Sequence, residues 1–117
     1  MSKSKYSESN LQKAVVDFIK MQFPKMLYCA SAGGVYTSMS QAKKMKATGY
    51  VKGFPDLFIY EPIGKYYGLA IELKVKGNYA SKEQKEWIER LNKRGYYAKV
   101  CTGFEDCIYT IKKYLEN

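Results

Sequence analysis

The sequence predicts an α/β fold in which helices cover a mixed β-sheet, in the order helix, strand, strand, strand, helix, strand, helix. Three segments carry apolar residues at helical spacing, and four short apolar runs lie between them. A short turn joins the second and third runs, which indicates an antiparallel hairpin. A helix separates the third and fourth runs, which indicates a parallel crossover. The chain has the length of one domain, so residues 1–117 are expected to form a single unit.

The first half of the chain predicts a helix, a strand and a basic segment. Apolar residues recur at helical spacing over residues 7–22, and Ser7 or Ser9 can cap the start of this helix. An apolar run over residues 25–32 predicts the first strand, which two glycines bring to an end. Residues 36–49 predict either a short basic helix or a long loop that ends at a glycine.

The second half of the chain predicts the hairpin, the crossover and the last helix. One strand is expected to begin at Asp56, and its partner lies beyond the turn, over residues 67–75. Residues 81–84 read Ser-Lys-Glu-Gln, which is the spacing of a capping box and predicts the start of a helix. A strand over residues 96–102 follows that helix. Residues 102–105, Thr-Gly-Phe-Glu, predict a second capping box before the last helix.

The chain is strongly basic, and its charge is unevenly placed. Twenty Lys and Arg residues against eleven Asp and Glu residues give a net charge of +9. No acidic residue lies between Asp17 and Asp56, although several lysines do. Most of the basic residues are lysines, which contact phosphates as point charges, so we expect recognition of nucleic-acid shape and backbone rather than base sequence. The alternative is a basic face that serves only solubility.

The residue types that the chain lacks exclude several classes of enzyme. Without histidine, it cannot build His-dependent zinc sites, Ser-His-Asp triads or Cys-His nucleophiles from its own residues. Its three cysteines lack the C-x-x-C spacing and are expected to be reduced and mostly buried. No apolar run approaches the roughly 20 residues of a membrane span, and no signal peptide is visible. We therefore expect a soluble cytoplasmic protein with no membrane partner.

One strand of the hairpin carries a carboxylate and an ammonium on its polar face. In residues 68–77, GLAIELKVKG, apolar residues alternate with Glu72 and Lys74. Pairing across the turn would bring Asp56 towards both side chains. Two carboxylates and the backbone carbonyl of Leu73 can hold Mg²⁺ or Mn²⁺, while Lys74 positions or deprotonates an attacking water. The alternative is that Glu72 and Lys74 face solvent as a weak ion pair.

These residues resemble the signature of the PD-(D/E)XK nucleases, in which Pro55-Asp56 and Glu72-Leu73-Lys74 occupy the motif positions. The similarity to the virus-type replication-repair branch, the VRR-NUC domain, is closer still and covers essentially the whole chain. The features shared with that branch are Glu8 and Gln12 in the first helix, a Gly-x-Pro-Asp, a Glu-x-Lys, and Ser81 and Gln84 at the start of the following helix.

The resemblance implies catalytic roles for five residues. Asp56 and Glu72 would bind the metal, and Lys74 would orient the nucleophile. Glu8 would support the metal site from the first helix, and Gln84 would lie beside it. Glu8 has the alternative role of a favourable charge at a helix N-terminus, and the capping box already explains Gln84. Asp56 after a proline also has an alternative role in a turn.

Basic and loop residues are the candidates for DNA binding. The expected phosphate contacts are Lys43, Lys44, Lys46, Lys52 and Lys76. Gly33 and Gly34 either allow the close approach of a phosphate backbone or only end a strand. Weaker candidates, as base-stacking residues in predicted loops, are Tyr36, Tyr50 and Tyr79.

Together these features predict a Mg²⁺- or Mn²⁺-dependent endodeoxyribonuclease with a restriction-endonuclease-like core. The resemblance implies hydrolysis of branched DNA such as Holliday junctions, action as a homodimer, and a bacterial or phage-infected host cell. The rival function is a non-catalytic nucleic-acid-binding module. Within the enzyme class, the alternatives are a flap or other structure-specific nuclease, an RNase or a restriction enzyme, and the scarcity of Arg counts against the last.

Overall fold

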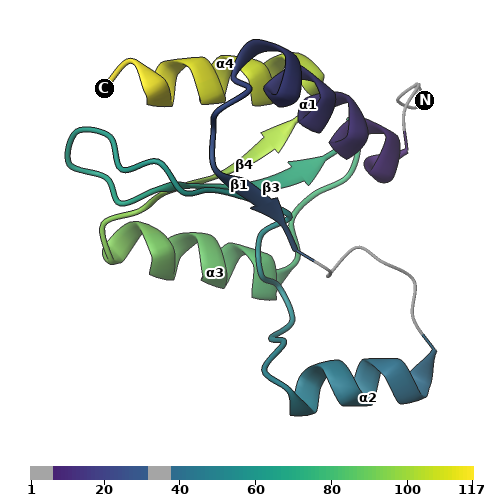
Figure 1. Cartoon of the computed structure of the whole chain (residues 1–117). Helices are drawn as coiled ribbons and strands as arrows, with labels where there is room; N and C mark the ends of the chain where they lie inside the picture. Colours follow the sequence, from purple (N-terminus) through teal and green to yellow (C-terminus); the bar gives the residue numbers. More distant parts are fainter. Residues whose placement is uncertain (1–6, 32–37) are drawn as a thin grey trace.

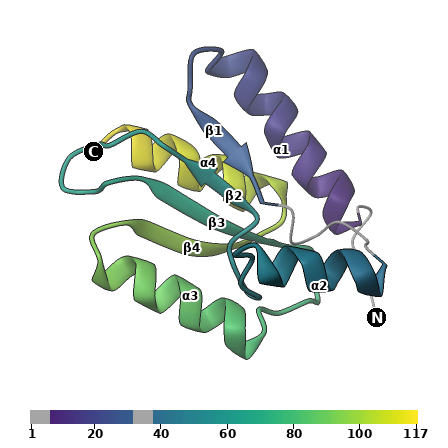
Figure 2. The ribbon, with the colours of Figure 1, turned by 60° about the horizontal axis from the view of Figure 1, so that its bottom comes forward.

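Helices cover both faces of a four-stranded sheet (Figure 1). The computed structural model describes residues 7–31 and 38–117. The helices are α1 (Glu8–Gln22), α2 (Met39–Ala47), α3 (Lys82–Lys93) and α4 (Phe104–Leu115). The strands are β1 (Tyr28–Ala30), β2 (Leu57–Ile59), β3 (Leu69–Lys74) and β4 (Tyr97–Thr102). They follow one another across the sheet in chain order (Figure 2).

The sheet is mixed, and both predicted connections are confirmed. β2 pairs with β1 and with β3 antiparallel, whereas β3 and β4 are parallel and are joined by α3. All four strands are shorter than predicted. Over the described residues 25–31, β1 spans only Tyr28–Ala30, and β2 begins one residue after Asp56. β3 covers 69–74 of the predicted 67–75, and β4 begins one residue later than predicted. The predicted order of elements holds with one addition, α2, between β1 and β2.

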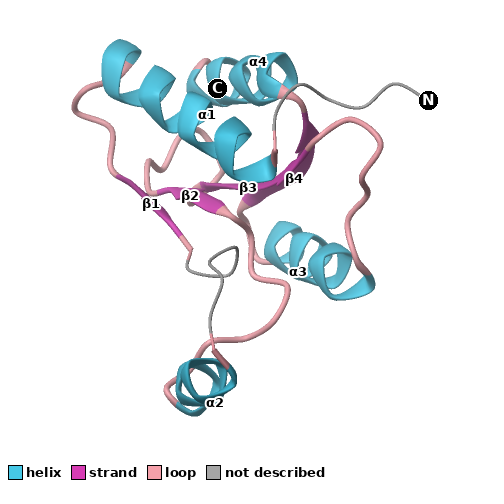
Figure 3. Cartoon of the chain, turned by 90° about the vertical axis from the view of Figure 1, so that its right-hand side faces the viewer, coloured by secondary structure: helices cyan, strands magenta, loops and turns pink. Residues whose placement is uncertain are grey.

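α2 is the basic segment that the sequence left open between helix and loop. Ser38 and Gln41 form a capping box at its start, and the Thr48 hydroxyl donates to the Lys44 carbonyl at 2.8 Å at its end. No residue of α2 is buried. Figures 1 and 3 show α2 standing apart from the sheet and from the other helices. Caps at both ends therefore support α2 more than packing does.

α1 and α4 lie on one face of the sheet, and α3 lies on the other (Figures 1 and 3). The main core forms where Leu11, Val15 and Ile19 of α1 pack with apolar residues of α4, β2 and β3. β3 is an inner strand and is buried along its whole length. Because both faces of β3 are covered, Glu72 and Lys74 are buried, and the solvent-facing alternative for this pair is wrong.

The starts of α1 and α3 are capped as predicted, but the predicted second capping box is wrong. Thr102 is the last residue of β4, and α4 begins after Gly103, which has no side chain to cap it. The Thr102 amide donates to Asp106 Oδ2 at 2.9 Å, so Asp106 rather than Glu105 joins the strand to the helix. Thr102 therefore pairs with β3 in the sheet and does not cap α4, although the local sequence fits a capping box.

Two expectations about the whole chain can be compared with the structure. Cys101 and Cys107 are buried free thiols, as expected, whereas Cys29 is exposed. Over residues 7–31 and 38–117, no helix combines the length and the apolar character that crossing a bilayer requires.

The segment between α2 and β2 contacts α3 through a hydrogen bond, a ring contact and a close backbone approach. The Trp87 indole donates to the Lys52 carbonyl at 3.2 Å, and its ring meets that of Phe54 edge-on. Gly53 has a φ of 95°, and a Cβ at this position would lie 2.7 Å from the backbone of Glu83. Only glycine allows this close approach, which places the chain just before β2 against the start of α3.

Gly53→Ala is expected to destabilise the protein more than Gly77→Ala. Both glycines have a φ of 95°, but a Cβ at Gly77 would meet no atom within 4 Å. Each change forces a side chain into left-handed backbone at a cost of about 1 kcal/mol. Only Gly53→Ala adds overlap with α3, which costs a further 1–3 kcal/mol, approximately. Urea unfolding followed by Trp87 fluorescence measures both losses, and equal losses would contradict this account of Gly53.

Candidate metal centre

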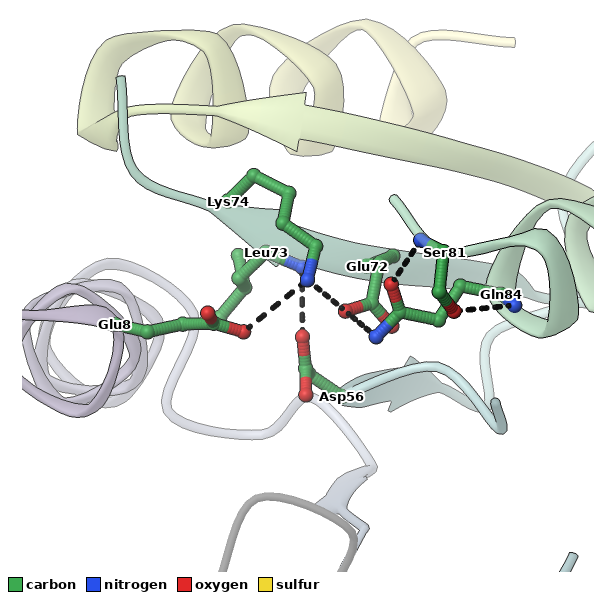
Figure 4. Close-up of polar contacts among 7 residues, drawn as sticks. All are labelled: Glu8, Asp56, Glu72, Leu73, Lys74, Ser81 and Gln84. Carbon is green, nitrogen blue, oxygen red and sulfur yellow. Dashed lines mark hydrogen bonds and ion pairs between the residues drawn. The ribbon is translucent and has the colours of Figure 1, made fainter. Parts of the chain in front are cut away.

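Three carboxylates meet at one end of the sheet. Glu8 is the first residue of α1, Asp56 directly precedes β2, and Glu72 lies in β3. One oxygen from each of these side chains lies within 4.8 Å of the other two. Figure 4 shows the three carboxylates arranged around the Lys74 side chain, with Gln84 of α3 beside Glu72.

The pairing of β2 with β3 explains why Asp56 and Glu72 lie close together. Leu57 is opposite Ile71, so the same register continued by one residue sets Asp56 opposite Glu72. Opposed residues of an antiparallel pair point to the same face. The Leu73 amide donates to Asp56 Oδ2 at 2.8 Å, which holds the carboxylate in place beyond the last backbone pair. The hairpin thus brings together the carboxylates that the sequence placed on it.

Lys74 lies between carboxylates from two elements. It follows Glu72 by two positions on the strand, so both side chains share one face. Its ammonium is 3.4 Å from Glu72 Oε2 and 3.8 Å from Glu8 Oε1, and the Lys74 residue is only 8% exposed. Glu8 therefore has both features that the sequence offered as alternatives: it opens α1, and it faces the cluster.

Both the oxygen and the nitrogen of the Gln84 side-chain amide form hydrogen bonds. Its Oε1 accepts from the Ser81 amide at 2.8 Å, which completes the capping box at the start of α3. Its Nε2 donates to Glu72 Oε2 at 2.9 Å. Sequence reasoning treated capping and a place in the site as competing explanations. The structure combines them, because an amide has an acceptor and a donor that can face different partners.

Glu72 is the most strongly perturbed carboxylate of the cluster. The residue is 1% exposed, and its Oε1 is a buried oxygen with no hydrogen-bond partner among the residues that the structure describes. Burial and the neighbouring Asp56 raise the pKa of Glu72 to about 8, and Lys74 offsets part of this effect. Burial also raises the pKa of Glu8. An unpartnered oxygen among three carboxylates fits a divalent cation that takes oxygen ligands.

A cavity of about 300 Å³ opens onto this cluster. The segment before β2 supplies part of its wall through Tyr50, Lys52, Gly53 and Phe54. Lys52 and Tyr50 were candidates from the sequence, whereas Gly53 and Phe54 were not. Gly53 and Phe54 directly precede Pro55-Asp56, and this position was the signal that could have identified them. Residues next to a candidate metal ligand in the chain also lie near it in space.

None of the other described candidates for DNA contact lines this cavity. Lys43, Lys44 and Lys46 are exposed on α2, and Lys76 is exposed just after β3. Tyr79 is 85% exposed and does not line the cavity. Gly33, Gly34 and Tyr36 lie outside the described residues. Roles in DNA binding for all of these residues stay predictions.

Comparison with known proteins identifies one consistent relationship. The profile of the VRR-NUC domain family matches residues 3–105. A solved structure described as a VRR_NUC domain protein is 36% identical with a TM-score of 0.82, covering 95% of this chain and 89% of that chain. Another, described as a VRR_NUC domain, is 22% identical with a TM-score of 0.62, covering 92% of this chain and 96% of that chain, and it shows likeness of fold alone. A search of the curated proteins found no match.

The raised pKa of Glu72 predicts how stability depends on pH without metal. Between the pKa of an unfolded Glu, about 4.3, and the folded value of about 8, only the folded state keeps the proton. The Glu72 contribution to the free energy of unfolding is therefore fully present below the unfolded pKa. It falls by up to about 1.4 kcal/mol per pH unit as pH rises towards the folded pKa. Urea unfolding in EDTA from pH 5 to pH 8 measures the slope.

Glu72→Gln removes the titrating group and is expected to flatten this part of the pH dependence. Glu86→Gln is the matched control, because Glu86 is exposed on α3 and should leave the slope of the wild type unchanged. Parallel pH curves for the wild type and Glu72→Gln would show that Glu72 does not hold a proton in the folded protein.

Proposed function

Because the chain belongs to the VRR-NUC domain family, we propose that it is a Mg²⁺- or Mn²⁺-dependent endodeoxyribonuclease that cleaves branched DNA such as Holliday junctions. Membership of this family makes it a nuclease-type domain with a nucleic-acid substrate. One observation carries the proposal further: Glu72 Oε1 is buried and unpartnered beside the carboxylates of Glu8 and Asp56. A chain that only bound nucleic acid would gain nothing from three carboxylates placed where phosphates must approach.

The cation would be held by Asp56, Glu72 and the backbone carbonyl of Leu73, with Glu8 in support from α1. When bound, such an ion stabilises negative charge on the phosphodiester oxygens and lowers the pKa of coordinated water. Glu72 must be ionised to serve as a ligand, so cation and proton compete for it. Its raised pKa therefore implies that cation affinity increases with pH up to about 8.

Lys74 and Gln84 would complete the reaction machinery. The Lys74 ammonium lies between Glu72 and Glu8, where it can hold and orient the water that attacks phosphorus. Gln84 keeps Glu72 Oε2 directed by a 2.9 Å hydrogen bond, which leaves Oε1 available for the cation. Gln84 thus has a positioning role that its capping function does not prevent.

Lysines on two segments would bind the DNA backbone. Lys52 lines the cavity beside the carboxylates, and Lys76 follows the strand that carries Glu72. The lysines of α2 would contact phosphates farther from the cut, together with Gly33 and Gly34. The stretch without acids between Asp17 and Asp56 supports this assignment, because no carboxylate there repels the backbone.

A homodimer would suit a branched substrate. Two copies related by a two-fold axis present two sites, which can nick two strands of a junction with matching geometry. We propose this assembly for a single domain over residues 1–117, acting in the cytoplasm of a bacterium or a phage-infected cell.

Cleavage assays with Asp56→Asn test the proposal. Labelled four-way junction, flap, duplex and single-stranded DNA are incubated with the wild type or the variant in Mg²⁺, Mn²⁺ or EDTA. The wild type is expected to cut junctions in either metal and not in EDTA. Asp56→Asn should lower the rate by roughly 100-fold or more, since it removes a ligand of the charge-stabilising ion. Glu86→Gln, an exposed carboxylate-to-amide change on α3, is the control and should cut normally.

Three results would contradict parts of this proposal. Equal cleavage by the wild type and Asp56→Asn would remove the reaction from this site. Binding without cleavage in both metals would favour the non-catalytic nucleic-acid-binding module. Preference for flaps over junctions would make the protein a flap nuclease and leave the catalytic assignment intact.

Removing the three α2 lysines tests their part in DNA binding. A triple variant with Lys43, Lys44 and Lys46 changed to Ala should bind all DNA sequences more weakly. Each lost phosphate contact should reduce the slope of log K against log salt by about 0.9. The control is a triple Ala variant at Lys93, Lys112 and Lys113, which loses the same charge on α3 and α4. Equal slopes for the two variants would mean that net charge, not α2, governs binding.

A further inference from the structure

The carboxylate cluster borders a second, larger hollow that the proposed reaction does not use. This hollow of about 610 Å³ shares Glu8 and Asp56 with the cavity described above. The other described residues that line it are Ser7, Ser9, Gln12, Lys13, Val16 and Ser31. Most of them belong to α1, so we call this space the α1 hollow. A phosphodiester bound at Glu8 and Asp56 would therefore border both spaces.

Helix periodicity builds the wall of the α1 hollow. Leu11, Val15 and Ile19 form the buried stripe of α1. Ser9, Gln12 and Val16 recur every three or four residues and form the neighbouring stripe, which faces the hollow. Residues three and four apart lie together on a helix, so Gln12 lies one turn beyond Glu8. The sequence thus places an amide directly beside a candidate metal ligand.

Among the described residues, the charges of the α1 hollow favour a phosphate group less than those of the neighbouring cavity do. The only cation among the described residues that line the hollow is Lys13, and this ammonium is 2.7 Å from Asp17 Oδ2. The other charged groups that the described residues place on this wall are the carboxylates of Glu8 and Asp56. In contrast, the cavity described above is also lined by Lys52 and Lys74. Hydroxyls, an amide and the apolar Val16 fit an uncharged group that both stacks and forms hydrogen bonds.

Gln12 is the group in the α1 hollow with unused hydrogen-bonding capacity. It is half-buried, and its side-chain amide makes no hydrogen bond with the described part of the chain. An amide offers both donors and an acceptor, and glutamine can pair with the edge of a base. A base can present its edge inside a hollow only if it has left the duplex stack.

We propose that the α1 hollow binds the sugar and the unpaired base of a nucleotide next to the scissile phosphate, with Gln12 hydrogen-bonded to the base. This inference rests on the proposed nuclease function and names a feature of branched DNA that the site recognises: a nucleotide that is unpaired at the branch point, as in a flap or in a junction with an extra base. Such a nucleotide enters without the free energy that a paired base must first spend on unstacking.

Base capture can be measured without cleavage. The probe is a four-way junction with one extra, unpaired 2-aminopurine nucleotide at its branch point, and Ca²⁺ replaces Mg²⁺. The wild type should raise the fluorescence as the base leaves its neighbours and enters the hollow. Gln12→Ala should weaken this response roughly three- to tenfold in apparent affinity, which is the effect of one hydrogen bond. Gln22→Ala, the same change at the other end of α1, should match the wild type.

An abasic site at the same nucleotide separates base capture from an effect on the metal site. On that DNA, the wild type and both variants should bind equally, and all three should bind Mn²⁺ with the same affinity. A response of Gln12→Ala equal to that of the wild type would overturn the inference, and so would an equal loss on abasic DNA.

The two proposals fail in different ways. Junction cleavage in Mg²⁺ by a wild type whose fluorescence response does not depend on Gln12 overturns base capture and leaves the nuclease. A Gln12-dependent response with no cleavage in any metal overturns the nuclease and supports base capture alone.

Discussion

The antiparallel pairing of β2 with β3 is the constraint on which the site depends. Its register sets Asp56 opposite Glu72, and the Leu73 amide holds the Asp56 carboxylate at 2.8 Å. β3 can position both because it is an inner strand, paired on its other edge with β4. The starts of α1 and α3 then meet the end of β3 and contribute Glu8 and Gln84 (Figure 4). A slip of one residue in the register would turn the polar side chains of β3 to the opposite face and separate the cluster.

Burial of Glu72 favours the protonated side chain in the folded protein, whereas metal binding needs the ionised side chain. An ionised carboxylate in such a position is unfavourable unless it is paired, and here the Gln84 amide and Lys74 satisfy one oxygen while the other has no partner. Without a cation, protonation removes the unfavourable buried charge, and this preference for the protonated form is the raised pKa of Glu72. A cation would replace the proton and would stabilise the fold by binding only the native state. The apolar core beneath α1 and α4 is what allows the protein to tolerate this arrangement.

Local signals predicted most of the elements, and the failures also have identifiable causes. The Thr102 capping pattern failed because Thr102 pairs with Lys74 as the last residue of β4, so α4 could start only after Gly103. The helical form of α2 was undecided because α2 buries no residue and therefore has no apolar stripe to reveal it. The capping box alone accounted for Gln84 in the sequence, because the Ser81–Gln84 spacing predicts the helix cap. That spacing cannot show that Gln84 also reaches Glu72, twelve residues earlier in the chain.

Periodicity, turn residues and composition were enough to predict the fold class, the hairpin, the stretch without acids and the set of carboxylate and lysine residues, because these signals can be read along the chain without knowing what packs against it. Packing in three dimensions buries the polar face of β3, leaves Glu72 Oε1 without a partner among the described residues, and sets Gln12 beside a hollow shared with the site. Alternation along a strand shows that two faces differ, but not what packs against each. Burial and electrostatic environment arise from groups far apart in the sequence, which only packing brings together.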